Sequence, residues 1–178
     1  MSIEIDVLNG EQSWTLAEPL MKAVWPQEVL DKLPWGHIQF AQADLRVLIE
    51  QPEGGLACHV GIYFRTVIWN GRKFHIGGIG GLATRADSRG QGYASIALNA
   101  AVQTMRDHEA VQFALLFCES HNFAFYGSRG WHPTLLEDVP VPRPTLEATP
   151  DLERHGWRHR TPLAEVVHEE RFGRPALR

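Results

Sequence analysis

Apolar residues recur at helical spacing in two parts of the chain and form alternating or continuous runs elsewhere. The helical spacing predicts an amphipathic helix over Trp14–Val24 and a second one from Ala94 to Met105. Shorter helices are expected at Glu28–Lys32 and at Asn122–Ser128. The apolar runs predict strands at Ser2–Leu8, Leu45–Glu50, Leu56–Ile68, Phe74–Thr84, Val111–Cys118 and Trp131–Leu136.

The dipeptide Asn70-Gly71 lies between two of the predicted strands. Asn-Gly favours the turn of a two-residue hairpin, so we expect these two strands to pair antiparallel. Later strands are separated by helices, which allows parallel pairing as well. The order of the elements therefore predicts an α+β fold with a mixed, mainly antiparallel sheet flanked by helices.

The last part of the chain has a different character. Residues 138–178 hold six of the 11 prolines and show too little apolar periodicity for a core of their own. We therefore expect one domain over residues 1–137 and a Pro-rich arm over residues 138–178 that packs on it.

The composition narrows the class of protein. The chain has 178 residues, 44% of them apolar, and a net charge of −4, which favours a globular domain and argues against nucleic-acid binding by bulk charge. Cys58 and Cys118 form no CxxC motif, so a disulfide framework or a structural zinc site is not expected. No apolar run is long enough to span a membrane and no signal-peptide pattern opens the chain, so we expect a cytoplasmic protein with no metal.

Glycine is the most informative residue type. Seven of the 16 glycines fall between Gly71 and Gly92, and six of them form two clusters. The first, Gly77-Gly78-Ile79-Gly80-Gly81, contains a nominal dinucleotide-binding pattern, but that reading needs a helix to begin at the glycines, and none is predicted until after Arg89. The other reading is a strand without side chains, which another backbone or a ligand can approach or which can bulge.

The second cluster, Arg89-Gly90-Gln91-Gly92-Tyr93-Ala94, is called the glycine loop below. Its small residues leave backbone N–H groups uncovered where the predicted helix begins, and the helix dipole adds positive charge there. This combination suits a pyrophosphate, with Arg89 adding a charge at the entrance. The alternative is a tight turn that only starts the helix.

The stretch Leu82–Ala94 resembles the GNAT superfamily of acyl-coenzyme A-dependent N-acyltransferases, whose signature Arg/Gln-x-x-Gly-x-Gly/Ala is met by Arg89, Gly92 and Ala94. A second family feature, Phe-Tyr before Gly and an aromatic residue, is met by Phe125-Tyr126 and Gly130-Trp131. The resemblance covers Leu45 to Leu136, about half of the chain. The nearest likeness within the superfamily is to aminoglycoside 2′-N-acetyltransferases.

The resemblance implies a site for acetyl-coenzyme A. The pantetheine amides would pair with the backbone of Leu82–Thr84, the glycine loop would hold the pyrophosphate, and the thioester would lie near Gly80–Leu82, whose N–H groups can stabilise an oxyanion. The cofactor-binding residues implied are Leu82, Ala83, Thr84, Arg89, Gly90, Gln91, Gly92, Tyr93 and Ala94.

The resemblance also implies catalytic roles. Tyr126 would protonate the departing thiolate, although a tyrosine packed in the core is the other reading. The aminoglycoside enzymes carry a glutamate where this chain has Gly80. Substitute bases are His75, His59 and Glu119, and a base is unnecessary if the amine arrives neutral.

The amine acceptor is specified least. Trp25, Trp35 and His37 fall where the superfamily builds the acceptor wall, and acids of the arm could also face it: Glu137, Asp138, Asp151 and Glu153. We expect acetyl transfer from acetyl-CoA to a primary amine of a small molecule by direct attack, with a homodimer as one candidate assembly. The alternative is an acyl-CoA sensor without turnover.

Overall fold

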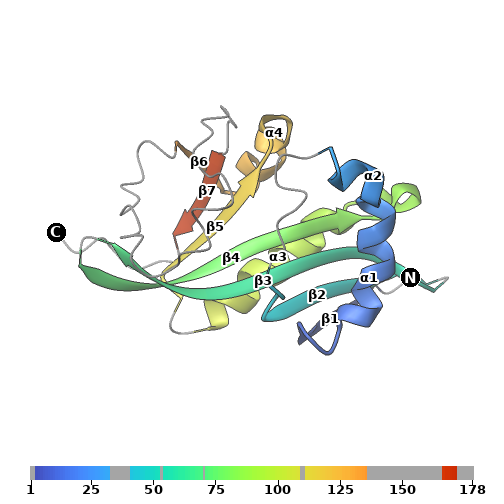
Figure 1. Cartoon of the computed structure of the whole chain (residues 1–178), viewed down its shortest axis with the longest axis horizontal. Helices are drawn as coiled ribbons and strands as arrows, with labels where there is room; N and C mark the ends of the chain where they lie inside the picture. The colour runs from blue at the N-terminus through green and yellow to red at the C-terminus, as the bar shows by residue number, and fades with distance from the viewer. Residues whose placement is uncertain are drawn as a thin grey trace.

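The computed structural model describes residues 3–32, 41–52, 54–69, 71–108, 111–135 and 166–171. They form a seven-stranded sheet with helix α1 on one face and helix α3 on the other (Figure 1). The predicted α+β class, with a mixed and mainly antiparallel sheet, is confirmed. The elements are β1 (Glu4–Asn9), α1 (Trp14–Val24), α2 (Gln27–Leu30), β2 (Leu45–Glu50), β3 (Leu56–Trp69), β4 (Arg72–Thr84), the 3₁₀ turn η1 (Ala86–Ser88), α3 (Tyr93–Asp107), β5 (Phe113–Cys118), the 3₁₀ turn η2 (Ser120–Asn122), α4 (Phe123–Gly127), β6 (His132–Leu135) and β7 (Val166–Arg171).

The sheet runs in the order β1-β2-β3-β4-β5-β7-β6. Strands β1 to β4 form an antiparallel meander, and the β3–β4 hairpin turns at Gly71, whose φ of +73° suits a glycine. This confirms the predicted hairpin, although Asn70 itself lies outside the described residues. Among the described strands, only β4 and β5 pair parallel, over the four pairs from Ile76–Phe113 to Ile79–Leu116.

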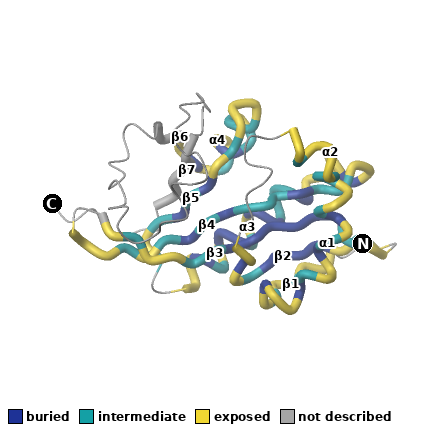
Figure 2. The backbone as a smooth tube through the Cα atoms, in the orientation of Figure 1, coloured by how far each residue is buried: buried dark blue, intermediate teal, exposed yellow. Residues whose placement is uncertain are grey.

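The main core lies between the sheet and α3. The strand side chains Val47, Ile49, Val60 and Ile62 are buried there with the apolar face of the helix. Figure 2 shows buried backbone along β2 and β3. The helix contributes Tyr93, Ala97, Leu98, Ala101, Val102 and Met105, which includes most of the residues whose spacing predicted it. Local periodicity was therefore sufficient to orient this helix.

Strand β7 was not predicted, because residues 138–178 show too little apolar periodicity to indicate a strand. It pairs antiparallel with both β5 and β6, so Val166–Arg171 lies between these two strands in the sheet. Its partners are 30 or more positions away in sequence, and such pairing leaves little local signal. The division into a domain of residues 1–137 and an arm of residues 138–178 stays a prediction.

Candidate active site

The strands β4 and β5 pair over only part of their length. Their last pair is Ile79–Leu116, but β4 continues to Thr84 and β5 to Cys118, and the two strands visibly diverge (Figure 1). Along this side Gly80–Thr84 has no strand partner in the described part of the chain. Leu82, Ala83 and Thr84, the residues expected to meet the pantetheine, thus line an open strand edge, which can accept hydrogen bonds from an extended ligand.

The glycine loop lies where α3 begins. Gly90 and Gly92 have φ angles of +76° and +87°, and a Cβ added to either would meet nothing within 4 Å. Gly92 is the N-cap of α3 and supplies no side-chain cap. Among the described residues, no acceptor lies in hydrogen-bonding geometry to the backbone N–H groups of residues 90–94. These groups and the helix dipole make the loop fit for an anionic ligand.

A hydrogen-bonded network holds the segment before the glycine loop. The Asp87 carboxylate accepts from Arg85 Nε at 2.7 Å and from Ser88 Oγ at 2.8 Å, and these bonds lower the pKa of Asp87. Gln51 donates through Nε2 to Ser88 Oγ at 2.7 Å and accepts from Arg85 Nη2. These bonds connect the segment before the glycine loop to Gln51, directly after β2. Because this segment is already ordered, less conformational entropy would be lost there when a ligand binds.

Tyr126 lies in α4, at the far end of β5. Its side chain is only 7% exposed, and its ring lies edge-on to Phe125 and to Trp131, with centroid separations of 5.0 and 6.4 Å. Burial raises its pKa to about 12, with a smaller contribution from Cys118. The phenol is therefore protonated across the physiological pH range and can act only as a proton donor.

The candidate bases differ in position. His75 is exposed on the hairpin, where its Nδ1 pairs with Thr66 Oγ1 at 3.0 Å, five residues and about 16 Å of strand before Gly80. Glu119 follows β5 and lies 3.1 Å from His121 Nδ1. Glu119 therefore follows the end of β5 that no longer pairs with β4, whereas His75 lies near the opposite end of β4.

His59, the third candidate, has no free ring nitrogen. It is 1% exposed on β3, with Nε2 2.9 Å from Arg46 Nη1 and Nδ1 2.7 Å from the Gly81 carbonyl oxygen. Arginine only donates, so Nε2 accepts and Nδ1 carries the proton. Burial lowers the pKa of His59 to about 4. The ring is therefore neutral and already engaged at neutral pH.

The first glycine cluster makes room for side chains. A Cβ at Gly77 would lie 2.3 Å from Met105 Sδ, and one at Gly80 would lie 2.9 Å from Tyr63 Cε2. Tyr63 also lies against Gly61 and Gly78, so its ring covers the strand at the position where a family glutamate was expected. The sequence analysis missed Tyr63. Counting back from the Asn-Gly turn would have placed this aromatic residue opposite Gly78, a recognised cross-strand pairing.

The acceptor wall is described only in part. Trp25 is half-buried at the C-terminal end of α1. The other expected wall residues lie outside the described residues: Trp35, His37, Glu137, Asp138, Asp151 and Glu153.

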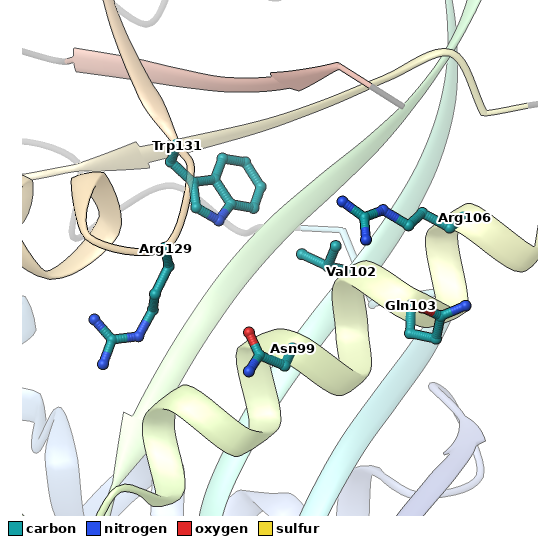
Figure 3. A pocket seen from close by; sticks show the side chains of 6 residues that line it. All are labelled: Asn99, Val102, Gln103, Arg106, Arg129 and Trp131. Carbon is teal, nitrogen blue, oxygen red and sulfur yellow. The ribbon is translucent and has the colours of Figure 1, made fainter. Parts of the chain in front are cut away.

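A polar cavity of about 250 Å³ lies between α3 and the segment that follows α4 (Figure 3). Asn99, Val102, Gln103 and Arg106 of α3 line it on one side, and Arg129 and Trp131 line it on the other. Arg129 donates to Ser95 Oγ and, at 2.6 Å, to the Phe125 carbonyl, so it joins the end of α4 to the first turn of α3. None of the predicted site residues lines this cavity.

The family described as the acetyltransferase (GNAT) domain matches residues 11–134, which is more than half of the chain. The chain belongs to this family. Within the described residues, no helix is long and apolar enough to cross a membrane.

Solved structures share the fold. An acetyltransferase of the GNAT family from Staphylococcus aureus is 11% identical with a TM-score of 0.59, over 97% of this chain and 100% of that one. Escherichia coli ElaA is 18% identical with a TM-score of 0.58, over 75% and 90%. A conserved protein of Enterococcus faecalis is 15% identical with a TM-score of 0.58. The match covers 76% of this chain but only 33% of that longer protein.

The buried neutral His59 predicts acid sensitivity. Its pKa is lowered from 6.5 to about 4, so between these pH values the unfolded chain binds a proton that the folded chain does not. We expect this group to remove about 3 kcal/mol from the free energy of unfolding as the pH falls from 6.5 to 4. Urea unfolding across this range, compared with the non-titrating His59→Asn variant, measures the effect. Identical pH slopes for the two proteins would contradict it.

Proposed function

We propose that this chain transfers an acetyl group from acetyl-CoA to a primary amine of a small molecule by direct attack. One observation carries the proposal: the unpaired edge of β4 leads from the thinned strand at Gly80 toward the uncovered N–H groups of the glycine loop. An extended ligand with amides in its middle and a pyrophosphate at one end suits this arrangement. The open space at Gly90 and Gly92 fits such a ligand.

When bound, acetyl-CoA supplies an acyl group activated as a thioester. The glycine loop would hold the pyrophosphate, and the β4 edge would align the pantetheine, which places the acyl carbon for attack. Backbone N–H groups at Gly80–Leu82 would stabilise negative charge that develops on the acyl oxygen. As the amide C–N bond forms and the thioester C–S bond breaks, Tyr126 Oη would give its proton to the leaving thiolate. The proton that the amine loses would pass to solvent, from which Tyr126 would regain its own.

The charged groups near Tyr63, where we expect the amine acceptor to bind, do not favour a polycationic substrate. Around Tyr63 the described charged groups are Arg46, Arg65 and Asp44, and Asp44 is already paired with Arg65 at 2.8 Å. Two cations and one acid do not attract a polycation. The likeness to aminoglycoside 2′-N-acetyltransferases therefore gains no support at this site, and a neutral or monocationic amine suits it better.

A second candidate function is binding of an acyl-CoA without turnover. The observation that favours it is the absence of a carboxylate at Gly80, together with the engagement of both His59 nitrogens. A homodimer and a cytoplasmic location stay predictions from the sequence.

Calorimetric titration with acetyl-CoA, followed by a thiol-release assay over a panel of amines, tests both candidates. Binding with turnover of at least one amine is the expected result. Binding without turnover of any amine would leave the sensor, and no binding of acetyl-CoA would contradict both.

A further inference from the structure

A buried series of hydrogen bonds crosses the α1 face of the sheet and ends at Gly81, in the part of β4 that no longer pairs with β5. Arg46 of β2 is 3% exposed and donates through Nε to the Gly10 carbonyl at 2.9 Å and through Nη2 to Gln42 Oε1 at 2.7 Å. Its guanidinium lies 4.8 Å from the centre of the Trp14 ring. Through Nη1 it also contacts His59, whose Nδ1–H donates to the Gly81 carbonyl. The N-terminal region is thereby connected to β4.

The Gly81 carbonyl, the last acceptor in this series of hydrogen bonds, lies in a β-bulge of β4. His59 is paired with Ala83 and Gly61 with Gly80, so Gly81 and Leu82 together face a single residue of β3. Gly81 has a φ of +61°, which favours glycine. A Cβ at this position would lie 3.3 Å from His59 Cε1 and 3.1 Å from Met21 Cε. The imidazole and α1 therefore pack directly against the bulge.

The bulge lies within the first residues of β4 after it parts from β5 at Ile79. Among the described strands, the backbone of the bulge therefore pairs only with β3 and depends on β3 for its conformation. A bulge in such a place commonly serves to aim backbone groups at a site.

Arg46 is expensive to bury, because no carboxylate among the described residues pairs with it. An apolar pair of similar volume would often be no less stable than buried polar groups of this kind. The chain of bonds does, however, fix the orientation of the Gly81 carbonyl, which an apolar pair could not do.

We propose that Arg46 and His59 are positioning residues: they hold the Gly81 carbonyl and so fix the Gly80–Leu82 backbone in the orientation that acyl transfer requires. The catalytic part of this proposal, an orientation required for acyl transfer, rests on the proposed function. The conformational part, that Arg46 and His59 hold the Gly80–Leu82 backbone, does not. The role differs from that of a general base, since His59 exchanges no proton with a substrate.

Three variants test the proposal. His59→Leu removes both hydrogen bonds. His59→Asn keeps an amide donor near the place of Nδ1. Leu48→Ala is the matched control, because Leu48 is the buried cross-strand partner of His59 on β2 and makes no bond to Gly81.

We expect His59→Leu to lower kcat about 30-fold with the KM for acetyl-CoA changed less than about 3-fold, because the cofactor is held elsewhere and only the alignment is lost. His59→Asn should recover most of kcat. Leu48→Ala should lower the unfolding temperature but keep kcat. Amide hydrogen exchange at residues 80–83 should increase in His59→Leu beyond its increase in Leu48→Ala.

Equal kcat in His59→Leu and Leu48→Ala, or a His59→Asn protein as slow as His59→Leu, would overturn the catalytic consequence. If the parent protein turned over no amine, the proposed function would fail, and exchange would decide the conformational part alone. Equal exchange at residues 80–83 in His59→Leu and Leu48→Ala would then overturn it.

Discussion

Replacing Tyr126 with phenylalanine is expected to lower kcat by about 10²- to 10⁴-fold, the range typical of a lost general acid. The phenol is buried and its pKa is raised to about 12, so it carries its proton at every pH at which the protein would work. Phenylalanine keeps the edge-on contacts with Phe125 and Trp131 and removes only the hydroxyl. Steady-state thiol release with a saturating amine measures the change.

Two controls keep the interpretation of the Tyr126→Phe result specific. The Kd for coenzyme A and the unfolding temperature should change little, because the glycine loop and the ring packing are retained. Below about pH 10 the parent kcat should show no inflection from this tyrosine. A Tyr126→Phe protein as fast as the parent would remove Tyr126 from the mechanism and leave it as a core residue.

Replacing Gly92 with valine is expected to raise the Kd for coenzyme A about 100-fold. Valine disfavours the left-handed φ of +87° found at this N-cap, so the loop would rearrange. Its side chain would also project into the open space where the pyrophosphate is proposed to lie. Isothermal titration calorimetry against coenzyme A measures the loss directly.

Gly71→Val is the matched control for this second prediction. Gly71 also has a positive φ, +73°, and open space at its Cβ, but it lies in the β3–β4 turn. Both variants should lose comparable stability through backbone strain. Only Gly92→Val should lose affinity, and a parental Kd in that variant would contradict the proposed pyrophosphate site.

Residues close together in sequence made part of the candidate site predictable. Arg89, Gly90 and Gly92 precede a clear helical pattern, so the glycine loop could be placed at a helix N-terminus without tertiary information. Tyr126 was located by its motif in the same way. Such features depend on backbone propensity and spacing, which act over one or two turns.

The reason for the glycines of β4 was not predictable in the same way. The sequence left open whether another backbone, a ligand or a bulge accounts for them. The structure has a bulge at Gly81–Leu82. Side chains lie where a Cβ would be: Met105 at Gly77, Tyr63 at Gly80 and His59 with Met21 at Gly81. Each of these neighbours comes from another element. Arg46 gave a faint signal, as a single charge inside the apolar run of β2, but nothing local identifies its partner.

By itself the sequence determined the helices, the hairpin, the α+β class and the glycine loop, because turn chemistry and apolar periodicity act between near neighbours. Only the tertiary structure decided that β7 enters the sheet beside β5, that the strands part after Ile79, and that His59 is bonded to Arg46 and Gly81. These contacts join segments far apart in the chain. Which of them form depends on how the elements pack together, which no short stretch of sequence encodes.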